Sequence, residues 1–251
     1  MSSLTTLETK ILRKVKTTKE QAQAHFCRYF TPLPEIRLST ITGKSAQRRL
    51  PVFTEDICLP PYHGGCGHDD FSPLANIVEY IDPQVIVELG TAYGNLTANL
   101  CNLCPSAFIH TVNAPADLQT GTSVTYSLSK EEIGRVYREH GFDQRVNQIL
   151  SNTLNLDLRP HLRGRPIDFA IIDACHDSEF VLNDFEKVHP FIRPGGIVLF
   201  HDTHPSLAAH LAGSYLACSR LRKRGLDICH LSCTWWAVWA NGKPHRSRRG
   251  A

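Results

Sequence analysis

The sequence predicts an α/β fold with a doubly wound, mainly parallel sheet, an antiparallel closing strand and an N-terminal helical extension. Two observations predict it. From Pro83 onward, short apolar runs alternate with stretches of helical character, which indicates right-handed crossovers between parallel strands. The runs at 85–87, 169–172 and 197–200 are also almost wholly apolar, as strands covered by helices on both faces should be.

The predicted elements follow one another from residue 72 onward. A helix is expected at 72–81, with Ser72 as its N-cap and proline at the next position. Strands are then expected at 85–89, 108–113, 146–150, 168–173 and 196–201, with helices at about 94–104, 129–140, 178–189 and 205–223. Residues 226–240 look strand-like throughout, which predicts two closing strands with an antiparallel pairing.

The first seventy residues differ from the rest. Residues 5–30 have helical spacing, and the proline-rich stretch at 31–70 predicts a loop. One face of the predicted helix is apolar and carries Leu7, Ile11, Leu12 and Val15. We therefore expect an N-terminal helical extension and lid loop at 1–70, a main domain at 71–243 and a disordered basic tail at 244–251.

Composition is that of an ordinary soluble globular protein, with 42% hydrophobic and 20% charged residues among 251. The net charge of +3 is too small to argue for a nucleic-acid partner. No apolar run approaches the roughly 18 residues that span a bilayer, and the N-terminus lacks the apolar core of a signal peptide. Nine cysteines cannot all pair within one chain, so reduced thiols in a cytoplasmic protein are expected.

A glycine-hinged turn follows the first strand of the main domain, where Glu88-Leu-Gly90-Thr-Ala-Tyr-Gly94 leads into a helix. Glycine lets the backbone approach a ligand closely. A dinucleotide site would place a further glycine at Ala92, whereas a carboxylate at Glu88 suits a cationic ligand. We expect a nucleoside cofactor to contact the turn through Glu88, Gly90, Thr91, Tyr93 and Gly94.

The next two strands end in polar residues that could hold the rest of a nucleoside. Asn113 stands where ribose hydroxyls would be bound, although it could equally be a turn former before Pro115. Asn152 and Thr153 follow the strand at 146–150 and are expected to reach an adenine edge. Two later strands end in ionisable residues, at Asp173 with His176 and at His201 with Asp202. Ligands of open α/β sheets bind at such strand ends, so these residues are expected to share one site.

Taken together, these motifs resemble class I S-adenosylmethionine-dependent methyltransferases, which have a Rossmann-like fold. Within that class the sequence is most similar to the branch of small-molecule and sugar O-methyltransferases, which carries an Ile-Asp-Gly-x-His segment and then a helix with an inward Asp. The resemblance covers about 72–205 and rests on Glu88–Gly94, Ile172-Asp-Ala-Cys-His176, Val181-Leu-Asn-Asp184, Arg193-Pro-Gly-Gly196 and His201-Asp202.

The resemblance implies S-adenosyl-L-methionine as cofactor, S-adenosyl-L-homocysteine as product and a small-molecule acceptor that is methylated at a hydroxyl oxygen. It places Asp173 beside the transferred methyl group, with His176, His201 and Asp202 facing the acceptor. The chain departs from the family pattern at Ala174, where glycine is usual, and at Asn113, where an acid is usual.

Two mechanisms fit these residues. In the first, His176 or His201 acts as a general base, a task that suits an imidazole with an ordinary pKa near about 6.5. In the second, Asp173, His201 and Asp202 hold a divalent metal ion that acidifies the acceptor hydroxyl. Mg²⁺ prefers oxygen ligands, so the histidine would favour Mn²⁺, Fe²⁺ or Zn²⁺. Of the two mechanisms, the sequence favours the histidine base.

Other functions fit the sequence less well. An RNA methyltransferase would need a basic face, and the chain offers little beyond Arg220–Arg224 and its tail. A non-catalytic S-adenosylmethionine-binding module would lack the ionisable strand ends. The cysteines and histidines at 58–68 have no structural-zinc spacing, and a substrate-covering lid or a surface loop fits them better. We also expect a possible homodimer through the N-terminal helix, with no membrane partner.

Overall fold

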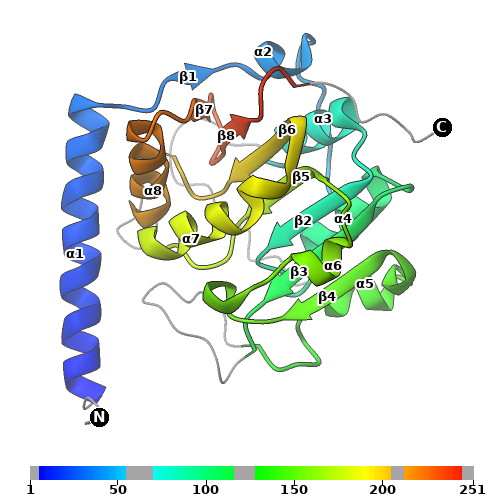
Figure 1. The fold of residues 1–251 in the computed structure, drawn as a ribbon, viewed down its shortest axis with the longest axis horizontal. Helices are drawn as coiled ribbons and strands as arrows, with labels where there is room; N and C mark the ends of the chain where they lie inside the picture. Colours follow the sequence, from blue (N-terminus) through cyan, green and yellow to red (C-terminus); the bar gives the residue numbers. More distant parts are fainter. Residues whose placement is uncertain (1–5, 55–69, 116–127, 205–211, 245–251) are drawn as a thin grey trace.

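The computed structural model describes residues 6–54, 70–115, 128–204 and 212–244, with side chains from residue 14 onward. Eight strands form one sheet in the order β1-β7-β8-β6-β5-β2-β3-β4 (Figure 1). The strands are β1 (Glu35–Ile36), β2 (Val85–Leu89), β3 (Phe108–Asn113), β4 (Val146–Leu150), β5 (Ile167–Ile172), β6 (Ile192–Phe200), β7 (Cys229–Leu231) and β8 (Ala237–Ala240).

The sheet is mainly parallel, as the sequence predicts. Strands β4, β3, β2, β5 and β6 run parallel to one another, and β8 pairs antiparallel with both β6 and β7. The two closing strands predicted within 226–240 are therefore confirmed. Every residue of β2 and β5 is buried. This agrees with their almost wholly apolar sequences, which predict strands covered by helices on both faces.

Helices cover both faces of the sheet (Figure 1). One apolar core lies between the sheet and α1, α6, α7 and α8, and a second lies between the sheet and α2, α3 and α4. The helices are α1 (Thr6–Phe30), α2 (Leu38–Thr42), α3 (Phe71–Ile81), α4 (Asn95–Leu103), α5 (Arg135–Glu139), α6 (Arg159–Leu162), α7 (Ser178–Val188) and α8 (Ala212–Lys223), with 3₁₀ turns at Asp143–Arg145, Thr153–Asn155 and His189–Phe191. Among the described residues, no helix is both long enough and apolar enough to cross a membrane.

Three local predictions differ from the structure. The helix expected at 129–140 forms only over 135–139, because Gly134 has a φ of +71° and interrupts it. Ser72 is not the N-cap of α3, since the helix begins at Phe71 and the Ser72 hydroxyl donates to the carbonyl of Arg49 instead. The predicted loop at 31–70 contains β1 and α2, while its residues 55–69 lie outside the described part of the chain.

The N-terminal segment is built into the fold. Strand β1 pairs in parallel with β7, and α1 lies alongside α8 (Figure 1). Glu20 of α1 is buried, and its carboxylate accepts hydrogen bonds from the backbone N–H of Ser178, at 3.1 Å, and from the Ser178 hydroxyl. Lys16 lies 3.3 Å from the buried carboxylate of Asp177. Because Ser178 begins α7, the two side chains of α1 fix the start of that helix.

We predict that Glu20→Ala destabilises the protein by about 1–3 kcal/mol, the usual cost of leaving buried hydrogen-bonding groups without a partner. Glu20→Gln should retain part of that stability, since its amide oxygen can still accept from Ser178. Urea denaturation followed by circular dichroism is the measurement. Lys19→Ala, an exposed change on the same helix, is the control. A Glu20→Ala variant as stable as the Lys19 control would contradict this role of Glu20.

Candidate active site

The carboxyl ends of three central strands meet at one edge of the sheet. Leu89 of β2 is in register with Ile172 of β5, and Ile172 is in register with Phe200 of β6. The ladder continues one step further, since Asp173 N–H donates to Leu89 at 2.8 Å and His201 N–H donates to Ile172 at 3.0 Å. The polar residues that follow these strands therefore start from adjacent, fixed backbone positions, as the sequence predicts.

The turn after β2 touches the end of β5 directly. Gly90 has a φ of +111°, and a Cβ at this position would lie 2.1 Å from the carbonyl oxygen of Asp173. No side chain fits in that space. The glycine is required by the close approach of two backbone segments, in addition to the ligand access for which the sequence predicts it. The glycine turn and the acidic strand end are consequently neighbours.

Glu88 lies beneath the turn and is fully buried. Its Oε2 accepts hydrogen bonds from the hydroxyls of Thr97, at 2.5 Å, and Thr111, at 2.6 Å. Burial raises the pKa of Glu88 to about 7, although both hydrogen bonds oppose the rise. Its Oε1 is buried and has no hydrogen-bond partner among the described residues. The described contacts of Glu88 are thus internal, and one acceptor atom remains unused.

Thr111 and Asn113 of the neighbouring strand β3 brace the turn. Asn113 Oδ1 accepts from the backbone N–H of Ala92 at 3.1 Å. The hydroxyl of Thr91 is buried, 2.7 Å from that of Thr111, and accepts from Gln148 Nε2 at 2.9 Å. The side-chain amide of Asn113 therefore holds the glycine turn in place. This role goes beyond the alternative in which Asn113 only forms a turn before Pro115.

Tyr93 and Gly94 connect the turn to α5. The carbonyl of Tyr93 accepts from Val136 N–H at 2.9 Å, and the carbonyl of Ala92 accepts from Gly134 N–H at 2.8 Å. Gly94 has a φ of +87°, and a Cβ there would lie 2.8 Å from Cα of Gly134. The unpredicted break in the helix at Gly134 is what allows this close packing.

Asn152 and Thr153 lie after β4, as expected, and their described contacts are with other residues of the protein. Asn152 accepts from the N–H of Leu154 and caps a 3₁₀ turn. The Thr153 side chain bonds to Asp184, which is the inward acid of α7 and is fully buried. Burial raises the pKa of Asp184 to about 7 despite that hydrogen bond.

Asp173, His176, His201 and Asp202 come together in what we call the acid–histidine cluster. His176 Nε2 lies 2.8 Å from Asp202 Oδ2 and 3.8 Å from Asp173 Oδ1. His201 Nδ1 lies 3.3 Å from Asp173 Oδ1 and 3.4 Å from Asp202 Oδ1. One ligand atom each from Asp173, His201 and Asp202 can be chosen so that all lie within 4.8 Å of one another.

Mutual attraction shifts the pKa values within the cluster. Burial alone would lower the pKa of His176, but hydrogen bonds with Asp173 and Asp202 raise it to about 9. The negative charges of the same two carboxylates raise the pKa of His201 well above its ordinary value against the opposing effect of burial. Burial would raise the pKa of Asp202, yet the charge of His201 and its hydrogen bond with His176 hold it far below its usual range. Without a ligand, both histidines therefore favour the doubly protonated, cationic form more than an ordinary histidine does.

Asp202 has a φ of +56°, in the left-handed region that costs a non-glycine residue about 1–2 kcal/mol. This conformation accompanies a carboxylate that contacts both histidines. Strained residues of this kind gather at functional sites, where the surrounding structure holds them in place. His176 is also incompletely satisfied, because its buried Nδ1 has no hydrogen-bond partner among the described residues.

Sequence reasoning missed Asp70, which lies just before α3. Its Oδ2 is 3.5 Å from His201 Nε2, and its other carboxylate oxygen accepts from the backbone N–H of Trp235 at 2.7 Å. The ring of Trp236 lies 4.3 Å from that of His201, centroid to centroid. No local sequence pattern marks Asp70, because its partners are more than 130 positions away along the chain.

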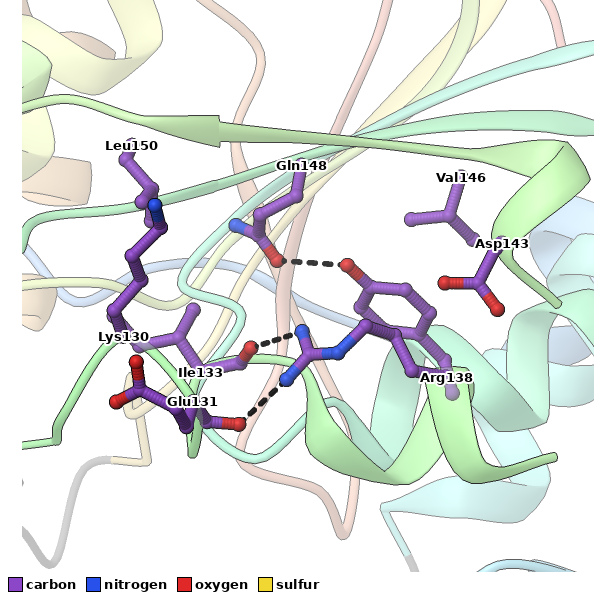
Figure 2. A pocket seen from close by; sticks show the side chains of 9 residues that line it. Lys130, Glu131, Ile133, Arg138, Asp143, Val146, Gln148 and Leu150 are labelled. Atoms are coloured by element: carbon purple, nitrogen blue, oxygen red, sulfur yellow. Dashed lines mark hydrogen bonds between the residues drawn. The ribbon is translucent and has the colours of Figure 1, made fainter. Parts of the chain in front are cut away.

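A separate cleft of about 700 Å³ lies between β4 and the segment around α5 (Figure 2). Tyr137 donates to Gln148 Oε1 there at 3.2 Å, and Arg138 donates to the carbonyls of Ile133 and Glu131. None of the acid–histidine cluster lines this cleft. Gln148 links this cleft to the turn, because its amide nitrogen donates to Thr91.

Residues 87–203 match the sequence profile of a protein family described as a methyltransferase domain. Over 127 residues the chain is 28% identical to an uncharacterised protein of Sinorhizobium fredii, a match that covers 51% of this chain and only 14% of that protein. The chain thus spans a small part of this curated relative. The segment that matches the family profile runs from β2 to just beyond Asp202 and includes the glycine turn and the acid–histidine cluster.

Solved structures show the same architecture. A Staphylococcus aureus protein described as a caffeoyl-CoA O-methyltransferase superposes with a TM-score of 0.51 at 13% identity, over 66% of this chain and 79% of that one. A Podospora anserina methyltransferase with S-adenosylhomocysteine bound gives 0.50 at 15% identity, over 68% and 79%. Together with the family match and the parallel sheet, this defines a class I methyltransferase fold. The predicted fold is confirmed.

We predict that Gly90→Ala destabilises the protein far more than Gly43→Ala. Both glycines have positive φ, but a Cβ at Gly43 meets nothing within 4 Å, whereas one at Gly90 meets the Asp173 carbonyl. The Gly43 change should cost about 1–2 kcal/mol, the left-handed penalty alone. Thermal and urea unfolding of the two variants measure the difference. Equal losses would show that the end of β5 can move away from the turn.

Proposed function

We propose that the chain is an S-adenosylmethionine-dependent methyltransferase that methylates a small molecule at a hydroxyl oxygen. The observation that carries the proposal is the contact between Gly90 and the Asp173 carbonyl, because it places the glycine turn directly beside the acid–histidine cluster. A cofactor seated on the turn would present its reactive end to the cluster. The match of residues 87–203 to a methyltransferase domain supports the same function.

The residues around the turn fit a nucleoside with a cationic end. Gly90 and Gly94 let the turn pack closely against Asp173 and Gly134, and Asn113 stands at the end of β3, where ribose hydroxyls would be held. The carboxylate oxygens of Asp173 and Asp202 lie next to the turn, where they could contact a sulfonium but would repel a pyrophosphate. We assign Thr91, Tyr93, Asn152 and Thr153 to the same cofactor site. Glu88, which lies beneath the turn, belongs to this site as well.

The cluster also fits a divalent metal ion. Asp173, His201 and Asp202 offer two carboxylates and one imidazole, a donor set that suits Mn²⁺, Fe²⁺ or Zn²⁺ better than Mg²⁺. When bound, such an ion lowers the pKa of a coordinated acceptor hydroxyl. The two carboxylates would also balance the charge of a divalent ion. Their pKa values are lowered, so both are ionised at neutral pH.

His176 orients one of these ligands. Its Nε2 is 2.8 Å from Asp202 Oδ2, while Asp202 Oδ1 faces His201. A carboxylate held on one oxygen presents the other in a fixed direction. We therefore assign His176 to holding Asp202, with the acceptor on the open side of Asp173 and His201, which are the more exposed pair of the cluster.

The electrostatics reverse the preference that the sequence gives for a histidine base. A general base must be unprotonated, and the pKa of His176 is raised to about 9 by its two carboxylate neighbours. The pKa of His201 is raised by the same carboxylates. A metal ion can displace the His201 proton and use the nitrogen as a ligand, because metal binding is coupled to ligand deprotonation. We therefore favour metal assistance.

We predict that the protein binds S-adenosylmethionine in calorimetry, and that tritiated methyl transfer to a panel of phenols, catechols and sugars stops in chelator and returns with Mn²⁺. Asp173→Asn and Asp202→Asn should lower turnover at least tenfold while cofactor binding persists. Asp157→Asn removes an exposed carboxylate and serves as the control. Preferential binding of NAD would refute the methyltransferase assignment. Full turnover in chelator would refute the metal alone and return the task to a base.

We also propose that α1 joins two copies of the chain. Phe26, Tyr29 and Phe30 recur at helical spacing and are 58%, 80% and 70% exposed. The rings of Phe26 and Phe30 lie against each other, with centroids 4.5 Å apart and a tilt of 35°. Neighbouring apolar side chains of this size on one helix face are typical of protein–protein contacts.

The dimer is tested by light scattering coupled to size-exclusion chromatography. We predict that the wild-type protein elutes at twice its 28.1 kDa chain mass, and that Tyr29→Glu converts it to a monomer at the same concentration. Leu154→Glu, which places the same charge at an exposed apolar residue far from α1 in the sequence, should leave the dimer intact. A wild-type monomer at high micromolar concentration would rule the proposal out.

A further inference from the structure

We infer that Asp70 is a positioning residue for the metal site: it holds Nε2 of His201 so that Nδ1 faces the carboxylates of Asp173 and Asp202. The inference rests on the metal site proposed above and adds a residue from a separate part of the chain. Asp70 stands at the N-cap position of α3, whereas the three candidate ligands follow β5 and β6.

The two nitrogens of His201 face different acids. Nδ1 lies 3.3 Å from Asp173 Oδ1 and 3.4 Å from Asp202 Oδ1, while Nε2 lies 3.5 Å from Asp70 Oδ2. Because Nδ1 and Nε2 are on different sides of the ring, an ion held between the carboxylates meets Nδ1 only. Asp70 is therefore placed to act through His201 and not as a ligand.

Asp70 is itself held in place by the loop before β8. Its Oδ1 accepts from the backbone N–H of Trp235 at 2.7 Å, and its own carbonyl accepts from the indole N–H of Trp236 at 2.9 Å. With Oδ1 occupied in this way, Oδ2 remains directed at His201 Nε2. The acid has a fixed orientation before any ligand binds.

The same loop also positions the imidazole ring. The Trp236 ring lies 4.3 Å from the His201 ring, tilted by 56°. The backbone N–H and the hydroxyl of Thr203 both donate to the Trp235 carbonyl at 3.0 Å, which ties the end of β6 to the loop. His201 thus has contacts on one ring face and at both nitrogens.

With a metal ion held by Asp173 and Asp202, the arrangement would select one tautomer of His201. A neutral imidazole carries its proton on one nitrogen and a lone pair on the other. A carboxylate at Nε2 stabilises the proton there, so that with an ion held by Asp173 and Asp202 the lone pair of His201 would be on Nδ1 and available to that ion. Metal-binding histidines commonly have such a carboxylate on the nitrogen away from the ion, and its loss typically weakens metal binding about 10- to 100-fold.

Asp70→Asn tests this with little change in shape. The amide oxygen that this substitution introduces can keep the bond from Trp235 N–H, which places the new NH₂ group opposite His201 Nε2. An N–H donor there requires a lone pair on Nε2 and moves the ring proton to Nδ1, the nitrogen that must bind the ion. The variant should remain folded and lose metal affinity.

The experiment measures Mn²⁺ affinity by electron paramagnetic resonance for the wild type, Asp70→Asn, His201→Ala and the double variant, with Asp157→Asn as control. We expect Asp70→Asn to bind Mn²⁺ about 10- to 100-fold more weakly. The double variant should bind no more weakly than His201→Ala, because Asp70 acts only through that ring. Losses that add, or an Asp70→Asn affinity equal to the control, would overturn the inference while leaving the metal site itself intact.

A second measurement needs no variant. With Zn²⁺ bound to the wild-type protein, long-range ¹H–¹⁵N NMR of the histidine rings should show His201 protonated at Nε2 and metal-bound at Nδ1. The reverse assignment would overturn the inference. A wild-type protein that binds neither metal, yet still binds S-adenosylmethionine, would refute the metal site and this role of Asp70 together, and leave the cofactor assignment standing.

Discussion

The contact between the backbone at Gly90 and the carbonyl of Asp173 sets the geometry of the whole site. Strands β2 and β5 are adjacent in the sheet but lie on either side of the point where the chain reverses direction across it. A crevice forms at such a point in open α/β sheets. Here the backbone at Gly90 lies directly against that of Asp173. The glycine turn and the acid–histidine cluster therefore cannot separate without breaking the hydrogen-bond ladder between β2 and β5.

Electrostatic balance is the second constraint on the site. The acid–histidine cluster contains two carboxylates and two imidazoles within hydrogen-bonding reach of one another, and each pair raises or lowers the pKa values of the other. Without a ligand, the protons on the histidines compensate the carboxylates. In the metal-bound form proposed above, an ion would take over that compensation, so that the buried carboxylates would not be left unpaired.

The sequence predicted the fold and the strand ends well because both depend on local patterns. Buried strands such as β2 and β5 are continuous apolar runs, and the residues that follow them are brought together by the sheet alone. Asn113 and the four members of the acid–histidine cluster were found in this way. Their roles in catalysis remain predictions, since sequence pattern places a side chain at an edge but does not give its partners.

What the sequence could not predict depends on contacts between distant segments. Asp70 contacts Trp235 and His201, and Glu20 contacts Ser178. These partners are 131 to 165 positions apart in the sequence, so no local pattern can predict the contacts. The break at Gly134 was missed for a related reason. Residues 129–140 are suitable for a helix, but the packing of Gly134 against Gly94 determines the backbone conformation there.

The arrangement of α1 and β1 has a consequence for how the chain folds. Their partners α8 and β7 lie far along the chain: Glu35 of β1, for example, is in register with His230. Until α8 and β7 have been synthesised, α1 and β1 lack these two partners. The central strands can pair earlier. Folding is therefore completed by a closure of the N-terminal segment onto the C-terminal one, a long-range step of the kind that slows folding and exposes apolar surface in the meantime.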